Sequence, residues 1–273
     1  MRKIIALVVA ASAISGTAMA DSGVFQFGGV LMPEAKVHNL WKVKIASGML
    51  DTNTTVVKGN TTDIRIAVPK PTPLLSIHSM GDEPIKNSVA KGARAEIGLT
   101  PIISYGASLD LDNGFDNSVI PIKLELQDDK GTKIGSLTAH MFAYGETIIN
   151  SVNGKNTERP QRTFLVAHKD DVFFGGLPTN NGGNIDAHDG LSRISKLDPS
   201  VLEQYDPSLK LPTWTNNLNM KEVSKTDPNL LFSAVYCSGF EQGASIDLKL
   251  DSPMSNGKAL SWRAMLPVTV SYM

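Results

Sequence analysis

Apolar and polar residues alternate along the last part of the sequence, from Leu260 to Met273. Side chains on a β-strand point alternately to its two faces, so this pattern predicts a strand with one buried face. A terminal strand of this kind needs partners to hold it in place, because chain ends otherwise fray. The apolar positions of the predicted strand are Leu260, Trp262, Ala264, Leu266, Val268, Val270 and Tyr272.

Similar signals recur through the middle of the chain. The turn sequence Asp128–Gly131 leads into a return strand at Lys133–Tyr144 and predicts a hairpin. The run Leu230–Cys237 is apolar on both faces, as in a central strand of a sandwich. Alternation also predicts strands at Trp41–Ile45, Asp63–Val68, Ile120–Leu126 and Ser245–Leu250.

Helical signals are scarce. One short helix is predicted from Asp198 to Tyr205, because Asp198 is a capping residue and Pro199 suits a first helical turn. Between about 150 and 229 the alternation fades into segments rich in Gly, Asn and Pro. We therefore predict an all-β sandwich in which residues 150–229 form a loop-rich insertion that contains the short helix.

The first 20 residues have the features of an export signal. Arg2 and Lys3 precede the apolar run Ile4–Ile14, and Ala18-Met19-Ala20 forms a small-x-small cleavage site. The run is too short to span a bilayer. We expect the mature chain to begin at Asp21 and to be secreted or periplasmic. The alternative is a buried N-terminal helix or strand.

Residues 21–32 form a short patterned arm at the start of the predicted mature chain. Phe25, Phe27, Gly29 and Leu31 would share one face of a strand. Such a face suits docking into a row of pockets, with the glycine at a point of close approach. The alternative is the first strand of the sandwich itself.

Charge and cysteine content exclude some functions. Loss of Arg2 and Lys3 with the signal moves the formal net charge from −1 to −3, which gives no reason to expect nucleic-acid binding. Cys237 is the one cysteine and lies in an apolar run, so a buried inert thiol is favoured over a nucleophile.

Several polar clusters could be taken for sites of chemistry. Asp110–Asp116 resembles the front of a calcium loop, but Ile120 stands where a bidentate glutamate is required, so a polar turn is favoured. The residues around His168 and His188 fit no zinc spacing. No pair of carboxylates stands out for catalysis. We predict no metal, no cofactor and no enzymatic activity.

Two aromatic residues of the predicted insertion are candidates for ligand contact. Trp214 lies between prolines and polar residues, where its ring could stack on a sugar, and Tyr205 could assist. Packing in a satellite core is the alternative for both.

The chain resembles the Fae-type family of fimbrial subunits, which chaperone–usher systems assemble. The matching segments begin with Phe27-Gly28-Gly29 and Trp41-Lys42-Val43. They continue with Gly131–Leu137, Phe173–Leu177 and Ser233–Tyr236, and end with Trp262 and Pro267–Tyr272. The short arm before Gly28-Gly29 is typical of a minor rather than a major subunit.

This resemblance implies a mechanism of assembly. Such a subunit is an incomplete immunoglobulin-like sandwich of residues 33–273, whose open groove a periplasmic chaperone fills first. At the outer-membrane usher, the arm of a neighbouring subunit replaces the chaperone's strand. Phe25, Phe27, Gly29 and Leu31 would be the donor, and Leu266, Val268, Val270 and Tyr272 would form one groove wall.

The resemblance also implies a place in surface fimbriae and a contribution to adhesion to a host glycoprotein or glycolipid. The alternative is a free secreted β-sandwich that binds or hydrolyses carbohydrate.

Overall fold

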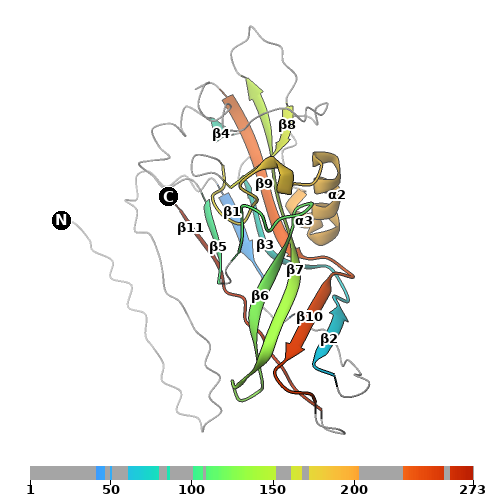
Figure 1. Ribbon diagram of the computed structural model, residues 1–273. Helices are drawn as coiled ribbons and strands as arrows, with labels where there is room; N and C mark the ends of the chain where they lie inside the picture. The colour runs from blue at the N-terminus through green and yellow to red at the C-terminus, as the bar shows by residue number, and fades with distance from the viewer. Residues whose placement is uncertain are drawn as a thin grey trace, which may run out of the picture. The chain divides into compact units, whose positions relative to one another are not determined.

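The structure is a computed structural model, which describes residues 41–46, 50, 61–79, 85–86, 101–106, 109–151, 161–167, 172–202, 230–254 and 259–272. Within these segments the chain is mostly antiparallel β-structure, as predicted (Figure 1). The predicted export signal and the arm at 21–32 lie outside the described residues, as do Tyr205, Trp214 and the Asn256-Gly257 turn.

One long strand organises the larger sheet. β7 (Lys133–Ser151) pairs along one edge with β6 (Val119–Gln127) and then with β8 (Gln161–Phe164). Along its other edge it pairs with β10 (Ser245–Leu250) and then with β9 (Leu230–Phe240). The central position of β9 explains why its sequence is apolar on both faces, as expected for a strand covered on both sides.

Four shorter strands complete this sheet. β2 (Asp63–Ala67) pairs with β10, and β3 (Thr72–Ser79) pairs with β9. β1 (Trp41–Ile45) pairs with β3, and β4 (Ile85–Lys86) pairs with β9. The alternating segments at 41–45, 63–68, 120–126 and 245–250 are therefore strands, whereas β3, β4 and β8 were not predicted.

The predicted hairpin is confirmed between β6 and β7. The Asp128 carboxylate accepts hydrogen bonds from the backbone N–H groups of Lys130 (3.0 Å) and Thr132 (2.7 Å). Gly131 has a φ of 81°, a left-handed conformation that glycine adopts at no steric cost. The turn chemistry of the sequence thus fixes the register of the two strands.

A second, two-stranded sheet faces the first across the core. It consists of β5 (Pro101–Tyr105) and β11 (Val268–Tyr272). Trp41 of β1 and Phe173 pack with their ring centroids 5.2 Å apart, and Phe173 meets Tyr236 of β9 at 5.9 Å. These fully or nearly fully buried rings form the middle of the sandwich.

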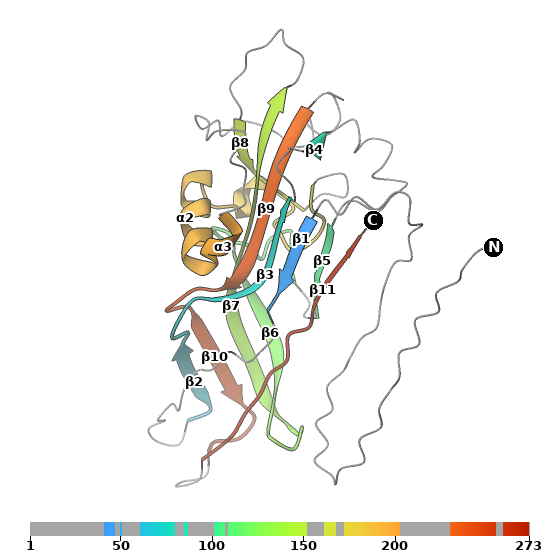
Figure 2. The ribbon, with the colours of Figure 1, turned by 180° about the vertical axis from the view of Figure 1, so that it is seen from behind.

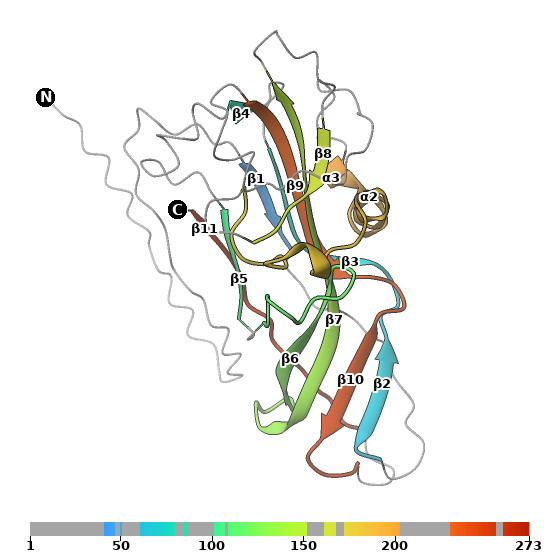
Figure 3. The same cartoon turned by 45° about the horizontal axis from the view of Figure 1, so that its top comes forward.

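Helices cover the outer face of β7 and β9 (Figure 3). After a 3-10 turn, η1 (Asn181–Gly183), come α2 (Ala187–Leu197) and α3 (Pro199–Leu202). α3 lies inside the predicted helix, but α2 was missed and is the longer of the two. Neither α-helix in the described segments has the length and apolar content to cross a membrane.

The polar segment around His188, which looked like a loop, begins α2. The Asp186 carboxylate accepts a hydrogen bond from the His188 N–H (2.8 Å) and caps this helix. Ile194 and Leu197 of α2 are buried against the sheet. Arg193 fixes the helix from its side, since its guanidinium pairs with Glu241, donates to Asn117 O (2.8 Å) and covers the Phe142 ring.

The prediction of one continuous terminal strand from Leu260 was wrong. β11 begins only at Val268, directly after Pro267, which has no N–H to donate to a sheet ladder. Earlier in the segment, Arg263 forms an isolated bridge with Gln127 of β6. Outside the strand, exposure alternates only from Ala264 to Pro267. It does not alternate at 260–263, where Leu260 and Ser261 are both exposed and Trp262 and Arg263 are both half-buried.

Candidate strand-binding edge

β11 is hydrogen-bonded along one edge. Its residues pair with β5 in an antiparallel register that runs from Val268 opposite Tyr105 to Tyr272 opposite Pro101. Among the strands that the structure describes, none pairs with the other edge of β11 (Figure 2). Backbone N–H and C=O groups on such an edge are a template for an added strand.

The inner face of β11 is apolar but incompletely covered. Val268, Val270 and Tyr272 are half-buried against the core, as is Leu266 just before the strand. The intervening Thr269 and Ser271 are exposed. Burial raises the pKa of the Tyr272 hydroxyl, so this ring lies in a less polar surrounding than bulk water. The four residues predicted as a groove wall therefore share one face, as expected.

The opposite edge of this sheet is closed. Phe174 bridges Ile102 of β5, with hydrogen bonds from Ile103 N–H to Phe174 O (2.7 Å) and from Phe174 N–H to Pro101 O (3.0 Å). Gly175 and Gly176 follow with φ of 77° and 67° and pass directly against Ile103. The sequence Phe173–Leu177 thus covers β5, and β11 carries the uncovered edge of the described pair.

A buried hydroxyl cluster ties β5 to the larger sheet. The Tyr105 hydroxyl lies 2.8 Å from that of Tyr236 and 2.5 Å from Ser238 Oγ, and Tyr236 donates to Gly176 O (3.1 Å). Burial raises the pKa of both tyrosines, so both stay neutral. The cluster holds the partner strand of β11 in place through β9 and the 172–177 segment.

The outer strand β2 differs from β11 because it carries charged side chains. β2 carries Asp63 and Arg65 as exposed residues, and Arg65 Nε donates to Asp247 of β10 at 2.5 Å. Charged side chains on an edge strand oppose the pairing of another strand there. β11, with the sequence VTVSY, has no charged residue. Of these two edges, β11 is the one suited to strand addition.

The remaining candidates from the sequence do not form a site in the described segments. Cys237 is fully buried, and burial raises the pKa of its thiol to about 12, which fits the inert thiol that we predicted. Asp110 accepts hydrogen bonds from the N–H groups of Asp112 (3.2 Å) and Asn113 (3.0 Å), as a polar turn does. No grouping of metal ligands occurs in the part of the chain that the structure describes.

Sequence reasoning missed the residues that position this edge. β5 has only five residues, and its alternation of Pro101, Ile103 and Tyr105 begins with a proline. The glycine pair at 175–176 was noted only as part of a family resemblance. Its structural reason, close passage of the backbone past β5, depends on a contact between distant parts of the chain.

Comparison with known proteins places the chain in a family. A search of curated proteins found no match. A family model described as "Fimbrial, major and minor subunit" matches residues 1–273. Together with the antiparallel sandwich and its uncovered strand edge, this match over the whole chain shows that the protein belongs to the Fae-type family of major and minor fimbrial subunits.

Proposed function

We propose that this fimbrial subunit is assembled by donor-strand exchange, with β11 as the acceptor edge. The observation that carries the proposal is the combination, on β11, of a half-buried apolar face and an uncharged edge that pairs with none of the described strands. An added strand would complete the backbone ladder and cover Leu266, Val268, Val270 and Tyr272. Backbone pairing supplies affinity in this mode of recognition, and alternate side chains supply selectivity.

The donor in this proposal is the arm at 21–32 of a neighbouring subunit. Phe25, Phe27, Gly29 and Leu31 would enter the acceptor face after the export signal at 1–20 has been removed. A periplasmic chaperone supplies the strand first, and exchange takes place at the outer-membrane usher. Because each subunit gives its arm to the next, the contact is heterologous and does not close, which produces a filament.

The proposed place of the chain is that of a minor subunit in a surface fimbria that contributes to adhesion. The short arm supports a minor rather than a major role. Trp214 and Tyr205 are the proposed contacts to a host glycoprotein or glycolipid. A Trp214→Ala variant tests this part, and unchanged binding to epithelial glycoproteins would remove Trp214 from the site.

Self-complementation tests the assembly proposal. A copy of residues 21–32 is appended after Met273 through a short linker, so that it can fold back along β11. This donor-complemented chain should be monomeric and markedly more heat-resistant than the mature chain, which should associate. The readouts are the melting temperature and the mass in solution.

A matched control separates strand addition from a simple effect of length. The same appended copy with Phe25→Asp and Phe27→Asp keeps the length but cannot enter an apolar face. It should behave like the mature chain. A mature chain that is already a stable monomer, and loses nothing when the arm is deleted, would refute assembly by donor-strand exchange.

A further inference from the structure

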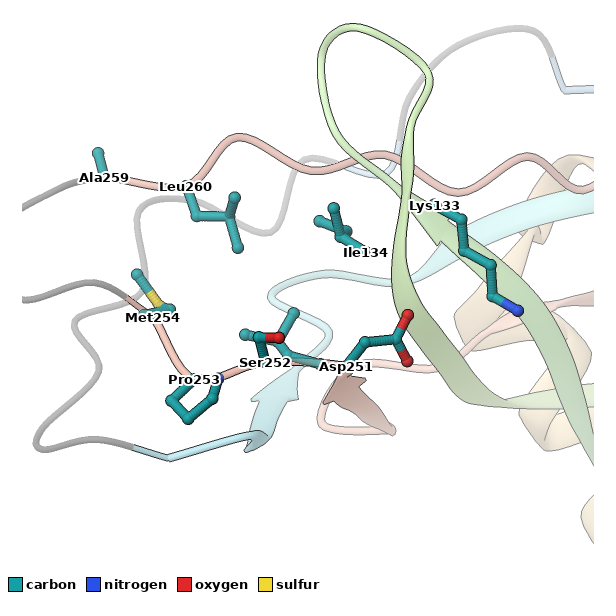
Figure 4. Close-up of a pocket in the computed structure, with 9 residues that line it drawn as sticks. Lys133, Ile134, Asp251, Ser252, Pro253, Met254, Ala259 and Leu260 are labelled. Atoms are coloured by element: carbon teal, nitrogen blue, oxygen red, sulfur yellow. The ribbon is translucent and has the colours of Figure 1, made fainter.

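A cleft lies near the end of the β6–β7 hairpin, on the same stretch of chain that leads into β11. Its volume is about 380 Å³. Figure 4 shows Met254, Ala259 and Leu260 toward one end of the cleft and Lys133 and Asp251 toward the other, with Ile134 between them. Leu260 lines this cleft and is 38% exposed.

This cleft precedes the acceptor face along the chain. Trp262 and Ala264 are half-buried against the same core as Leu266 and the residues of β11. Met265, between Ala264 and Leu266, is exposed, whereas Arg263, between Trp262 and Ala264, is half-buried. The apolar positions packed against the core therefore continue from Tyr272 past the start of β11 to Trp262, beyond the four positions that we assigned to the groove wall, and Leu260 of the cleft lies two residues before Trp262.

The donor sequence has a matching extension. Its odd positions remain apolar after Leu31, with Pro33, Ala35 and Val37, whereas Glu34 and Lys36 occupy even positions. The segments 25–37 and 260–272 each contain 13 residues and seven alternating apolar positions. At about 3.3 Å per residue, each spans roughly 43 Å when extended.

We propose that the donor strand of this subunit continues to Val37 and that its last part covers Ala264, Trp262 and the cleft at Leu260. This inference rests on the proposed function and names the full extent of the same interface. The occupant of the cleft is a second copy of this chain, through its residues 33–37. Antiparallel addition with Phe25 opposite Tyr272 brings Leu31 opposite Leu266 and Val37 opposite Leu260.

The side-chain sizes fit this register. Ala35, a small residue, lies opposite Trp262, and Pro33 lies opposite Ala264. Gly29 falls opposite Val268, where β11 begins. Pro33 has no N–H to donate, so the proposed ladder lacks one hydrogen bond opposite Ala264. Opposite residues of an antiparallel pair point to the same face, so all seven donor positions would meet the apolar side of the acceptor.

Two donor-complemented chains of different length test the extension. One carries residues 21–32 after Met273, and the other carries residues 21–40, each on the full mature chain with the same linker. We expect the longer copy to raise the melting temperature by a further ~4 °C, because Ala35 and Val37 become covered. Leu260→Asp should abolish this further rise and preserve the rise given by residues 21–32.

The outcomes separate this inference from the function on which it rests. Equal melting temperatures for the two lengths would overturn the extended donor and leave donor-strand exchange intact. Failure of both copies to stabilise the chain would refute donor-strand exchange itself. A further rise that persists with Leu260→Asp, or with Val37→Asp in the appended copy, would show that the added residues act elsewhere and would overturn the register.

Discussion

At the scale of the residue, the chemistry of single side chains follows from what surrounds them. Cys237 lies at the centre of β9, with Ser76 Oγ 3.8 Å from its Sγ, and burial suppresses its ionisation. Asp198 lies nearby, where it accepts hydrogen bonds from Ser76 (2.9 Å), Lys44 (3.1 Å) and Ser200 (2.5 Å). Burial therefore keeps the Cys237 thiol protonated, whereas hydrogen bonds keep the nearby Asp198 carboxyl ionised.

The Cys237 thiol should be unreactive in the native state. Thiolate is the reactive species, and at pH 8 a group with a pKa of about 12 supplies very little of it. We expect no measurable reaction of the donor-complemented chain with a chromogenic disulfide reagent, and one thiol per chain after denaturation. Rapid labelling of the folded chain would contradict the burial of Cys237.

Asp198 should make stability depend on pH. Burial opposes ionisation of this carboxyl, but hydrogen bonds from Ser200, Ser76 and Lys44 outweigh it and lower the pKa below the ordinary value. The group therefore stabilises the fold fully above the unfolded pKa of about 4, and this stabilisation is lost as the pH falls through the lower folded pKa.

Asp198→Asn should cost about 1–2 kcal/mol of unfolding free energy at pH 7. The Lys44 contribution is small because the Lys44 side chain is 61% exposed. Urea titrations of the donor-complemented chain should show the difference shrinking below about pH 4. A difference that stays constant from pH 7 to pH 3 would exclude the charge of Asp198 as its cause.

At the scale of the element, the segment 172–177 determines which edge of the small sheet stays available. Gly175 has a φ of 77°, and a Cβ built there would collide with Ile103 O of β5. Gly243 has a similar φ of 83°, yet a Cβ there would meet nothing within 4 Å. Comparing substitutions at the two glycines therefore distinguishes the cost of a left-handed backbone conformation from the cost of a steric clash with β5.

Gly175→Ala should be clearly more destabilising than Gly243→Ala. The second substitution pays only for the left-handed conformation, about 1–2 kcal/mol. The first must also displace the β5 backbone, so we expect a total above about 3 kcal/mol. Denaturant unfolding of both variants in the donor-complemented chain provides the comparison. Equal costs would mean that the contact between this segment and β5 is not tight.

Alternation predicted those strands that have one face in water. It identified β1, β2, β6 and β10, whereas the turn at Asp128–Gly131 identified β7 and the apolar run identified β9. β3 was missed because its second half is buried on both faces and Pro73 interrupts its first half. α2 was missed because its short apolar set, Leu191, Ile194 and Leu197, is diluted by polar residues. Both elements depend on tertiary contacts that local pattern does not contain.

The candidate site was predicted in part. The shared face of Leu266, Val268, Val270 and Tyr272 followed directly from spacing of two. Its partner β5 did not, because pairing between residues 101–105 and 268–272 spans most of the chain. Alternation also led us to begin the strand too early, at Leu260. The pattern indicates extended chain, but it does not show whether the backbone is hydrogen-bonded to another strand.

At the scale of the whole molecule, the described sandwich combines a buried core with an edge of β11 that pairs with no described strand. The outer strand β2 is charged, β5 is covered by residues 172–177, and β11 is neutral and half-covered. Under the proposed donor-strand exchange, this asymmetry would give assembly a direction, because the charged residues of β2 oppose an added strand and β11 carries none.

Hydrogen exchange at β11 tests this central claim most directly. We would compare the donor-complemented chain with the control whose appended arm carries Phe25→Asp and Phe27→Asp. Donor-strand addition predicts markedly slower amide exchange across Val268–Tyr272 in the first chain, with exchange at β2 unchanged. Equal exchange at β11 in the two chains would contradict it, because an added strand must hydrogen-bond that backbone edge.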